Sequence, residues 1–124
     1  MDQPNYQIED LIGVFPDAVN PKFCDFLVDY IDQSSYVSGR NYTHVKDKQI
    51  CLDAFSPGES KNLMEFVNGC LYYYINEISY LTNFNFISAV VLLQKTEPTQ
   101  GYHMFHGEDI NWNLQNRTMA WMVY

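Results

Sequence analysis

The side chains best suited to chemistry lie in the last quarter of the chain, between Gln94 and Tyr124. His106 and Glu108 are two residues apart, so in an extended strand both would point to one face, with about 6–7 Å of rise between them. An imidazole and a carboxylate placed in this way supply two legs of the two-histidine, one-carboxylate triad that holds non-haem Fe(II). The spacing therefore predicts a metal site at His106 and Glu108, with a third ligand from elsewhere in the protein.

The two other histidines offer alternatives for this site. His44 lies in an expected short strand, where a lone histidine is typically a half-exposed structural residue. His103 would face away from His106 in a strand, because the two lie three positions apart and successive side chains alternate between faces. In a helix these two histidines would be neighbours and would favour zinc. Gly101 and Gly107 bracket the segment and disfavour a helix, so we expect the strand and leave His44 as the upstream candidate for a third ligand.

The pair His106 and Glu108 alone would also suit a surface strand with two solvated side chains, so its neighbours matter. Tyr102 lies four residues before His106, and Arg117 opens the apolar segment RTMAWMVY. Together with His103, these residues resemble the start of the catalytic core in 2-oxoglutarate- and Fe(II)-dependent oxygenases of the prolyl 4-hydroxylase-like type. Family members more commonly carry aspartate at the position of Glu108. They also take a distal histidine and a basic anchor from later strands, for which this chain has no counterpart.

The resemblance implies Fe(II) as the metal, 2-oxoglutarate as the cosubstrate and ascorbate as an accessory reductant. His106 and Glu108 would be ligands, joined by a later histidine, and the Tyr102 phenol would donate a hydrogen bond to a 2-oxoglutarate carboxylate. The implied reaction converts 2-oxoglutarate to succinate while a C–H bond of a small-molecule or peptide substrate is hydroxylated. This chain alone is expected to be inactive, because the distal histidine and the basic anchor are missing. The alternative is a catalytically inactive remnant that binds a partner through an open sheet edge.

Composition limits the classes of function that remain. The 124 residues are 47% apolar and 16% aromatic, which is typical of one globular domain. Seven basic against fifteen acidic residues give a net charge of −8, which disfavours nucleic acid and anionic membranes as partners. The polar N-terminus and the lack of a long apolar run indicate neither a signal peptide nor a membrane span, so we expect a cytoplasmic protein. The three cysteines share no metal or disulfide spacing.

Two helices are predicted before the metal segment. Asn20 suits the N-cap and Pro21 the first helical position, which predicts a helix over residues 21–33. Ser56, Pro57 and Glu59 form a capping-box pattern that predicts a second helix over residues 57–80. Apolar residues recur on one face of each helix at steps of three and four, so both helices should pack against other elements.

Strands are predicted where β-branched and apolar residues cluster between turn residues. The expected strands are 11–15, 42–45, 49–54, a central strand at 86–94, the metal strand at 102–108 and a final strand at 117–124. Residues 34–41 are expected to form a loop, and residues 96–101 a polar turn that leads into the metal strand.

These elements predict an α+β fold in one domain. Residues 1–85 would form a helical and mixed N-terminal part, and residues 86–124 the start of a core that the family resemblance names a jelly roll, or double-stranded β-helix. The apolar end Ala120–Tyr124 would leave the chain ending inside that core with an unpaired strand edge. We therefore expect a fragment of a longer oxygenase that can self-associate through this edge.

Overall fold

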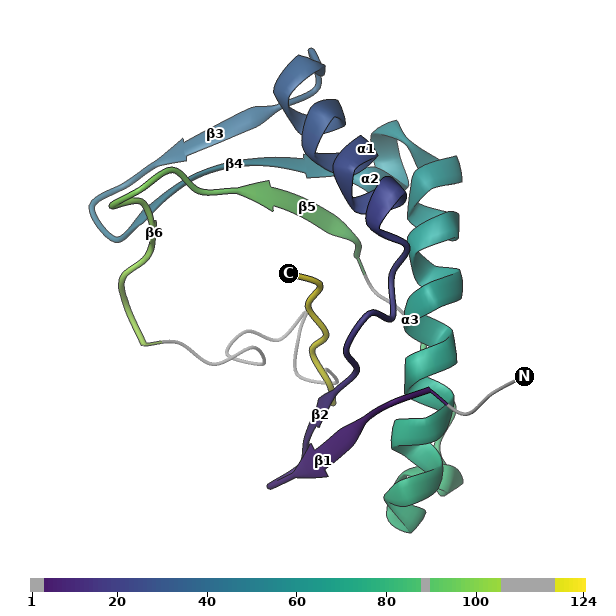
Figure 1. Cartoon of the computed structure of the whole chain (residues 1–124). Helices are drawn as coiled ribbons and strands as arrows, with labels where there is room; N and C mark the ends of the chain where they lie inside the picture. Colours follow the sequence, from purple (N-terminus) through teal and green to yellow (C-terminus); the bar gives the residue numbers. More distant parts are fainter. Residues whose placement is uncertain (1–3, 88–89, 106–117) are drawn as a thin grey trace.

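The computed structural model describes residues 4–87, 90–105 and 118–124. Within these ranges three α-helices accompany two antiparallel sheets, and the strands do not close into a barrel (Figure 1). The expected mixture of helices and antiparallel strands is confirmed. The jelly-roll arrangement is not confirmed by the part of the chain that the structure describes. None of the helices in this part is long and apolar enough to cross a membrane.

Helix α1 spans Pro21–Gln33, as predicted. The Asn20 side chain accepts a hydrogen bond from the Lys22 amide at 2.9 Å, which satisfies one of the free first-turn N–H groups. Leu27 and Ile31, one turn apart on the same helix face, are buried. The N-cap that the sequence predicts at Asn20 is therefore confirmed.

The second predicted helix is confirmed in position but not in its cap. A short helix α2 (Leu52–Phe55) precedes α3 (Pro57–Glu77), and a 3-10 helix η1 (Ser79–Asn83) follows it. Ser56 is the N-cap of α3, but its side chain makes no cap hydrogen bond, so the capping box expected there is wrong. Ser56 is at once the C-cap of α2 and the N-cap of α3, and its main-chain groups hydrogen-bond to both helices. Its N–H donates to the Leu52 carbonyl, while its carbonyl accepts from the amides of Glu59 and Ser60.

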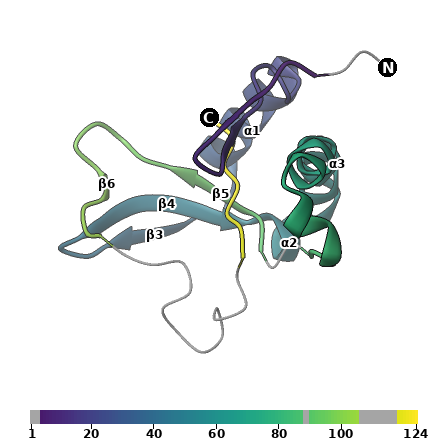
Figure 2. The same cartoon turned by 90° about the horizontal axis from the view of Figure 1, so that it is seen from below.

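The larger sheet contains β3 (Ser38–Asn41), β4 (Val45–Cys51), β5 (Leu92–Lys95) and β6 (Gly101–Tyr102). Strand β4 is central, because β3 pairs with one of its edges and β5 and β6 pair with the other. Helix α1 lies across one face of this sheet, and α3 stands at the end where β4 continues into α2 (Figures 1 and 2).

Three of the sequence predictions for this sheet are wrong. The expected loop at 34–41 contains β3. Of the expected strand at 42–45 only Val45 lies in a strand, because residues 42–44 form the turn that joins β3 to β4. The predicted central strand at 86–94 starts only at Leu92, and it lies beside β4 instead of in the centre. Strand β3 has the sequence SGRN and lacks apolar residues, so only its pairing with β4 makes it a strand.

A separate two-stranded hairpin of β1 (Gln7–Glu9) and β2 (Ile12–Val14) packs on the C-terminal half of α3 (Figure 1). The predicted strand at 11–15 corresponds to β2, whereas the polar strand β1 was not predicted. Tyr6 donates a hydrogen bond to Glu77 Oε1 at 2.6 Å, and the Tyr74 hydroxyl donates to the Leu11 carbonyl. These contacts join the hairpin to the helix.

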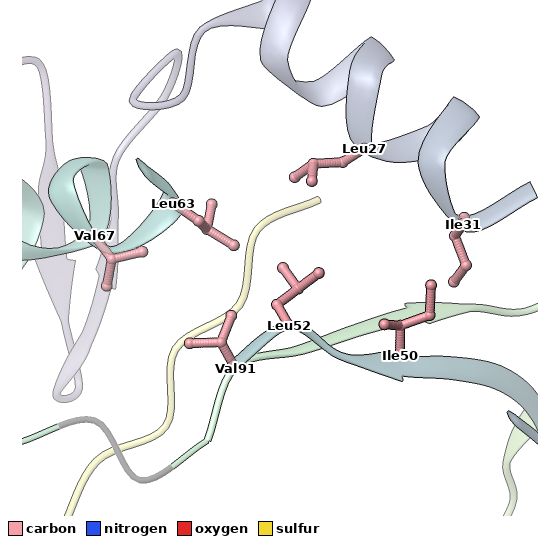
Figure 3. Packing of buried hydrophobic residues seen from close by; sticks show 7 residues of the cluster. All are labelled: Leu27, Ile31, Ile50, Leu52, Leu63, Val67 and Val91. Carbon is pink, nitrogen blue, oxygen red and sulfur yellow. The ribbon is translucent and has the colours of Figure 1, made fainter. Parts of the chain in front are cut away.

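The core lies where α1, α3 and the sheet meet. Its buried members point toward one another from these three directions, as Figure 3 shows: Leu27, Ile31, Ile50, Leu52, Leu63, Val67 and Val91. Burial of such aliphatic side chains contributes roughly 1.5–3 kcal/mol each, which makes this cluster the main source of stability in the described part.

Residues 118–124 do not form the strand that was expected over 117–124; Arg117 itself lies outside the described residues. They run as an irregular segment, with Trp121 half-buried against the core cluster. The unpaired strand edge inferred for the end of the chain is therefore absent from residues 118–124. An indole buries more apolar area by lying on a core than by projecting from an exposed edge, which accounts for this path.

Candidate functional site

Tyr102 is the one residue of the predicted site that the structure describes. It is the last residue of β6, which begins at Gly101, the last residue of the turn predicted at 96–101. Its backbone lies opposite Val45 on β4. Residues directly opposite in an antiparallel pair point to the same face. Tyr102 therefore shares a face with Val45, and its side chain is 44% exposed.

This face of the sheet is turned away from α1. Ile50 points toward Ile31 on α1 (Figure 3), whereas Val45 and Asp47 lie an odd number of residues from Ile50 and so face the opposite side. We call this side, which carries Arg40, Val45, Asp47 and Tyr102, the distal face.

An ion pair lies at the centre of the distal face. Arg40 and Asp47 are directly opposite on β3 and β4, and the Arg40 guanidinium forms a two-pronged contact with both carboxylate oxygens, with Nε at 2.8 Å from Oδ1. Asp47 is buried. The hydrogen bond to Asp47 raises the pKa of Arg40 above its ordinary value, and the carboxylate charge acts in the same direction against partial desolvation. Arg40 is thus held in place by Asp47.

His44 lies beside Tyr102 in the turn between β3 and β4. Its ring meets the Tyr102 ring edge-on, with 6.0 Å between centroids, and its carbonyl accepts a hydrogen bond from the His103 amide at 2.8 Å. Sequence analysis names His44 only as an upstream candidate for a third ligand. The structure places it next to the cofactor-binding residue that the sequence predicted, without testing whether it binds metal.

The predicted metal ligands His106 and Glu108 lie outside the described residues, as does Arg117. Of the strand expected over 102–108, only Tyr102 is in strand conformation, and residues 103–105 continue without strand structure. Among the described residues no three His, Cys, Asp or Glu side chains form a group that could hold a metal ion. The metal site, and the placement of His106 and Glu108 on the same strand face as Tyr102, therefore stay predictions.

The sequence does not predict the Arg40–Asp47 pair, because its local pattern indicates a loop at Arg40. A signal was present: the two residues are seven apart and flank a short polar segment, which suits opposite positions in a hairpin. The three cysteines, Cys24, Cys51 and Cys70, are free and half-buried, and burial raises the pKa of the Cys70 thiol. None of them lies next to Tyr102 in the register of the sheet.

Comparisons of the chain with protein-family models, with curated proteins and with solved structures gave no match.

Proposed function

We propose that the chain is part of a 2-oxoglutarate- and Fe(II)-dependent oxygenase, with His106 and Glu108 as metal ligands and Tyr102 as a cosubstrate-binding residue. The observation that supports this most is the position of Tyr102. It ends a short strand of the larger sheet, four residues before His106, and the residue is 44% exposed. A tyrosine carried on a paired strand has a fixed backbone position, and its hydroxyl is a group that can donate a hydrogen bond to a bound carboxylate.

The other residues of the distal face would support Tyr102 and would not bind 2-oxoglutarate themselves. Both prongs of the Arg40 guanidinium are engaged by Asp47, so Arg40 is a poor candidate for the basic anchor of the far carboxylate. Val45 is buried opposite Tyr102 and fixes the strand pairing beneath it. The His44 ring meets the Tyr102 ring in an edge-on contact. Fe(II), when bound, would supply the activation of dioxygen for C–H hydroxylation.

Binding of Mn(II), a redox-stable substitute for Fe(II), tests the metal site without requiring turnover. We expect weak binding, detected by loss of the free Mn(II) electron-paramagnetic-resonance signal, because two ligands alone make an incomplete site. The substitutions His106→Ala and Glu108→Ala should each abolish it. His103→Ala is the matched control, which should retain binding because this side chain is predicted to face away from the metal. Mn(II) binding that survives both ligand substitutions would contradict the proposed site.

Binding of 2-oxoglutarate tests the role of Tyr102. With Mn(II) present, 2-oxoglutarate should bind to the wild type, and Tyr102→Phe should weaken this about tenfold by removing one charge-assisted hydrogen bond. Tyr42→Phe, which removes an exposed phenol from the neighbouring turn, is the control and should have no effect. An equal loss in both variants would assign the effect to general packing and would remove Tyr102 from the site.

A further inference from the structure

The outer face of the β1–β2 hairpin presents a group of exposed apolar side chains. The register Gln7↔Val14 and Glu9↔Ile12 places these four residues on one face, while Gly13 lies on the other face, against the Tyr74 ring. Ile12 is 66% exposed, Val14 55% and Leu11, at the tip, 71%. We call Glu9, Asp10, Leu11, Ile12 and Val14 the hairpin surface. Contiguous exposed apolar groups with a polar rim are typical of protein interaction sites.

The backbone conformation at the tip of the hairpin is one that leucine rarely adopts. Asp10 and Leu11 have φ angles of 48° and 65°, as in the two-residue turns that favour Asn-Gly. A leucine is disfavoured in this left-handed conformation, and its exposed side chain gains little from burial in return. Glycine would suit the turn better, so folding stability does not account for leucine at this position. Strain of this kind is concentrated at functional sites.

Contacts with α3 hold the hairpin in place, and an ordered surface favours the binding of a partner. The Tyr74 hydroxyl donates a hydrogen bond to the Leu11 carbonyl, and Tyr6 stacks on Phe15 with 5.4 Å between ring centroids. The hydrogen bond from Tyr6 to Glu77 fixes the start of β1. A surface that is already ordered loses little conformational entropy when a partner binds.

The chemistry of the surface indicates the kind of partner. Gln7, Glu9, Asp10, Ile12 and Val14 line an open hollow of about 300 Å³. Of the residues that line it, Ile12 and Val14 are apolar and Glu9 and Asp10 are acidic, in a chain with a net charge of −8. Complementary charge guides and orients association. We propose that the hairpin surface binds a basic segment of a partner protein, with an apolar side chain of that segment in the hollow and lysine or arginine beside Glu9 and Asp10.

A labelled short peptide of alternating leucine and lysine is a suitable probe for this surface. Fluorescence anisotropy at physiological ionic strength should show it binding the whole chain at least about tenfold more tightly than a peptide with serine for leucine. A peptide with glutamate for lysine should bind as weakly as the serine peptide. Equal binding of the leucine and serine peptides would show attraction by net charge alone and would overturn the proposal.

Substitutions in the chain locate the binding. Leu11→Gly should weaken binding of the leucine–lysine peptide about five- to tenfold. The same substitution should raise the thermal midpoint of unfolding, because glycine adopts the left-handed turn conformation without strain. Loss of binding in a more stable variant cannot result from unfolding. Ile12→Ser should weaken binding by a similar factor, and Glu9→Gln by about threefold. Wild-type affinity in Leu11→Gly and Ile12→Ser would overturn the proposal.

Two matched controls and one further measurement complete the test. Val28→Ser removes an apolar side chain on α1, where Val28 is 56% exposed and so comparable with Ile12. Glu65→Gln removes an exposed acidic charge on α3. Both should leave peptide affinity unchanged, and a loss equal to that of Ile12→Ser or Glu9→Gln would contradict a site at the hairpin. Sedimentation equilibrium should show a monomer. A dimer that Ile12→Ser dissociates would instead make a second copy the occupant of this surface and would overturn the proposal.

Discussion

Ser60, buried in α3, donates its hydroxyl hydrogen to Asp53 Oδ1 across 2.6 Å. The other carboxylate oxygen of Asp53, Oδ2, accepts the Val91 amide at 2.6 Å. Next to this contact, the Leu52 amide donates to the Val91 carbonyl. The single side chain of Asp53 therefore links α2, α3 and the residue that leads into β5, at one side of the hydrophobic core.

Removal of this carboxylate should destabilise the fold. We expect Asp53→Ala to lower the free energy of unfolding by about 2–3 kcal/mol, because it leaves the Ser60 hydroxyl and the Val91 amide without their partner. Urea denaturation measures the change. Asp25→Ala, which removes an exposed carboxylate from α1, is the control and should stay within about 0.5 kcal/mol of wild type. Equal effects of the two substitutions would mean that the Asp53 contacts contribute nothing specific.

The Arg40–Asp47 pair on the distal face allows a double-substitution test. Arg40→Met should cost roughly 2–4 kcal/mol, because it leaves the buried Asp47 carboxylate without a counter-charge. The cost is at the lower end of the range for buried pairs, since the Arg40 side chain is 27% exposed. The double variant Arg40→Met/Asp47→Leu should be more stable than Arg40→Met alone, since no unpaired charge remains. Additive losses in urea denaturation would show that the two residues act independently.

Gly13 is expected to be required where the hairpin meets α3. A Cβ atom at this position would lie 2.8 Å from Tyr74 Cδ2 and 3.0 Å from Phe15 Cε2, so Gly13→Ala should destabilise by about 1–3 kcal/mol through overpacking. Gly69→Ala on α3 is the opposite case, with nothing within 4 Å of the added atom. That substitution should stabilise by about 0.5–1 kcal/mol, because alanine is the better helix residue. Thermal melts of both variants give the signs, and a neutral Gly13→Ala would refute the close packing on Tyr74.

The helices could be predicted because their signals are local. The cap at Asn20, the proline at Pro21 and the apolar face with Leu27 and Ile31 all lie within one segment, and α1 begins and ends at the predicted residues. Similar spacing in the second long helix placed α3 correctly to within three residues at its end. Helices depend on contacts between residues three and four apart, which a sequence displays directly.

The strands were predicted less well, because a strand exists only with a partner. Polar β3 is a strand since it pairs with β4, and residues 118–124 are apolar but have no strand partner among the described residues. The distal face illustrates the same limit. Tyr102, Arg40 and His44 come together through the register of β3, β4 and β6, which no local pattern reveals.

The two N-cap residues give a direct comparison of a confirmed and a failed sequence signal. Asn20→Ala should cost about 1 kcal/mol, because its side chain accepts the Lys22 amide. Ser56→Ala should change stability by less than about 0.5 kcal/mol, since the Ser56 side chain makes no cap hydrogen bond and its backbone contacts are kept. Chemical denaturation of both variants tests this. A loss at Ser56 equal to that at Asn20 would restore the capping box that the sequence suggested.

The ion pair between α1 and β5 gives stability a dependence on alkaline pH. Lys95 Nζ lies 2.6 Å from Asp32 Oδ1 and 3.7 Å from Glu97 Oε1, and the hydrogen bond to Asp32 raises the pKa of Lys95 above its ordinary value. A cationic group with a raised pKa stabilises the folded state fully below its unfolded pKa, and this contribution is lost as the pH rises through the folded pKa.

The difference in urea midpoint between wild type and Lys95→Met should therefore be constant up to about pH 10 and then narrow as the lysine loses its proton. High salt should reduce the difference at all pH values, because the pair is exposed and its charges are screened. In an Asp32→Asn background, Lys95→Met should lose most of its effect, since the main partner of the ammonium group has gone. A midpoint difference that widens above pH 10, or that persists in the Asp32→Asn background, would contradict stabilisation by this pair.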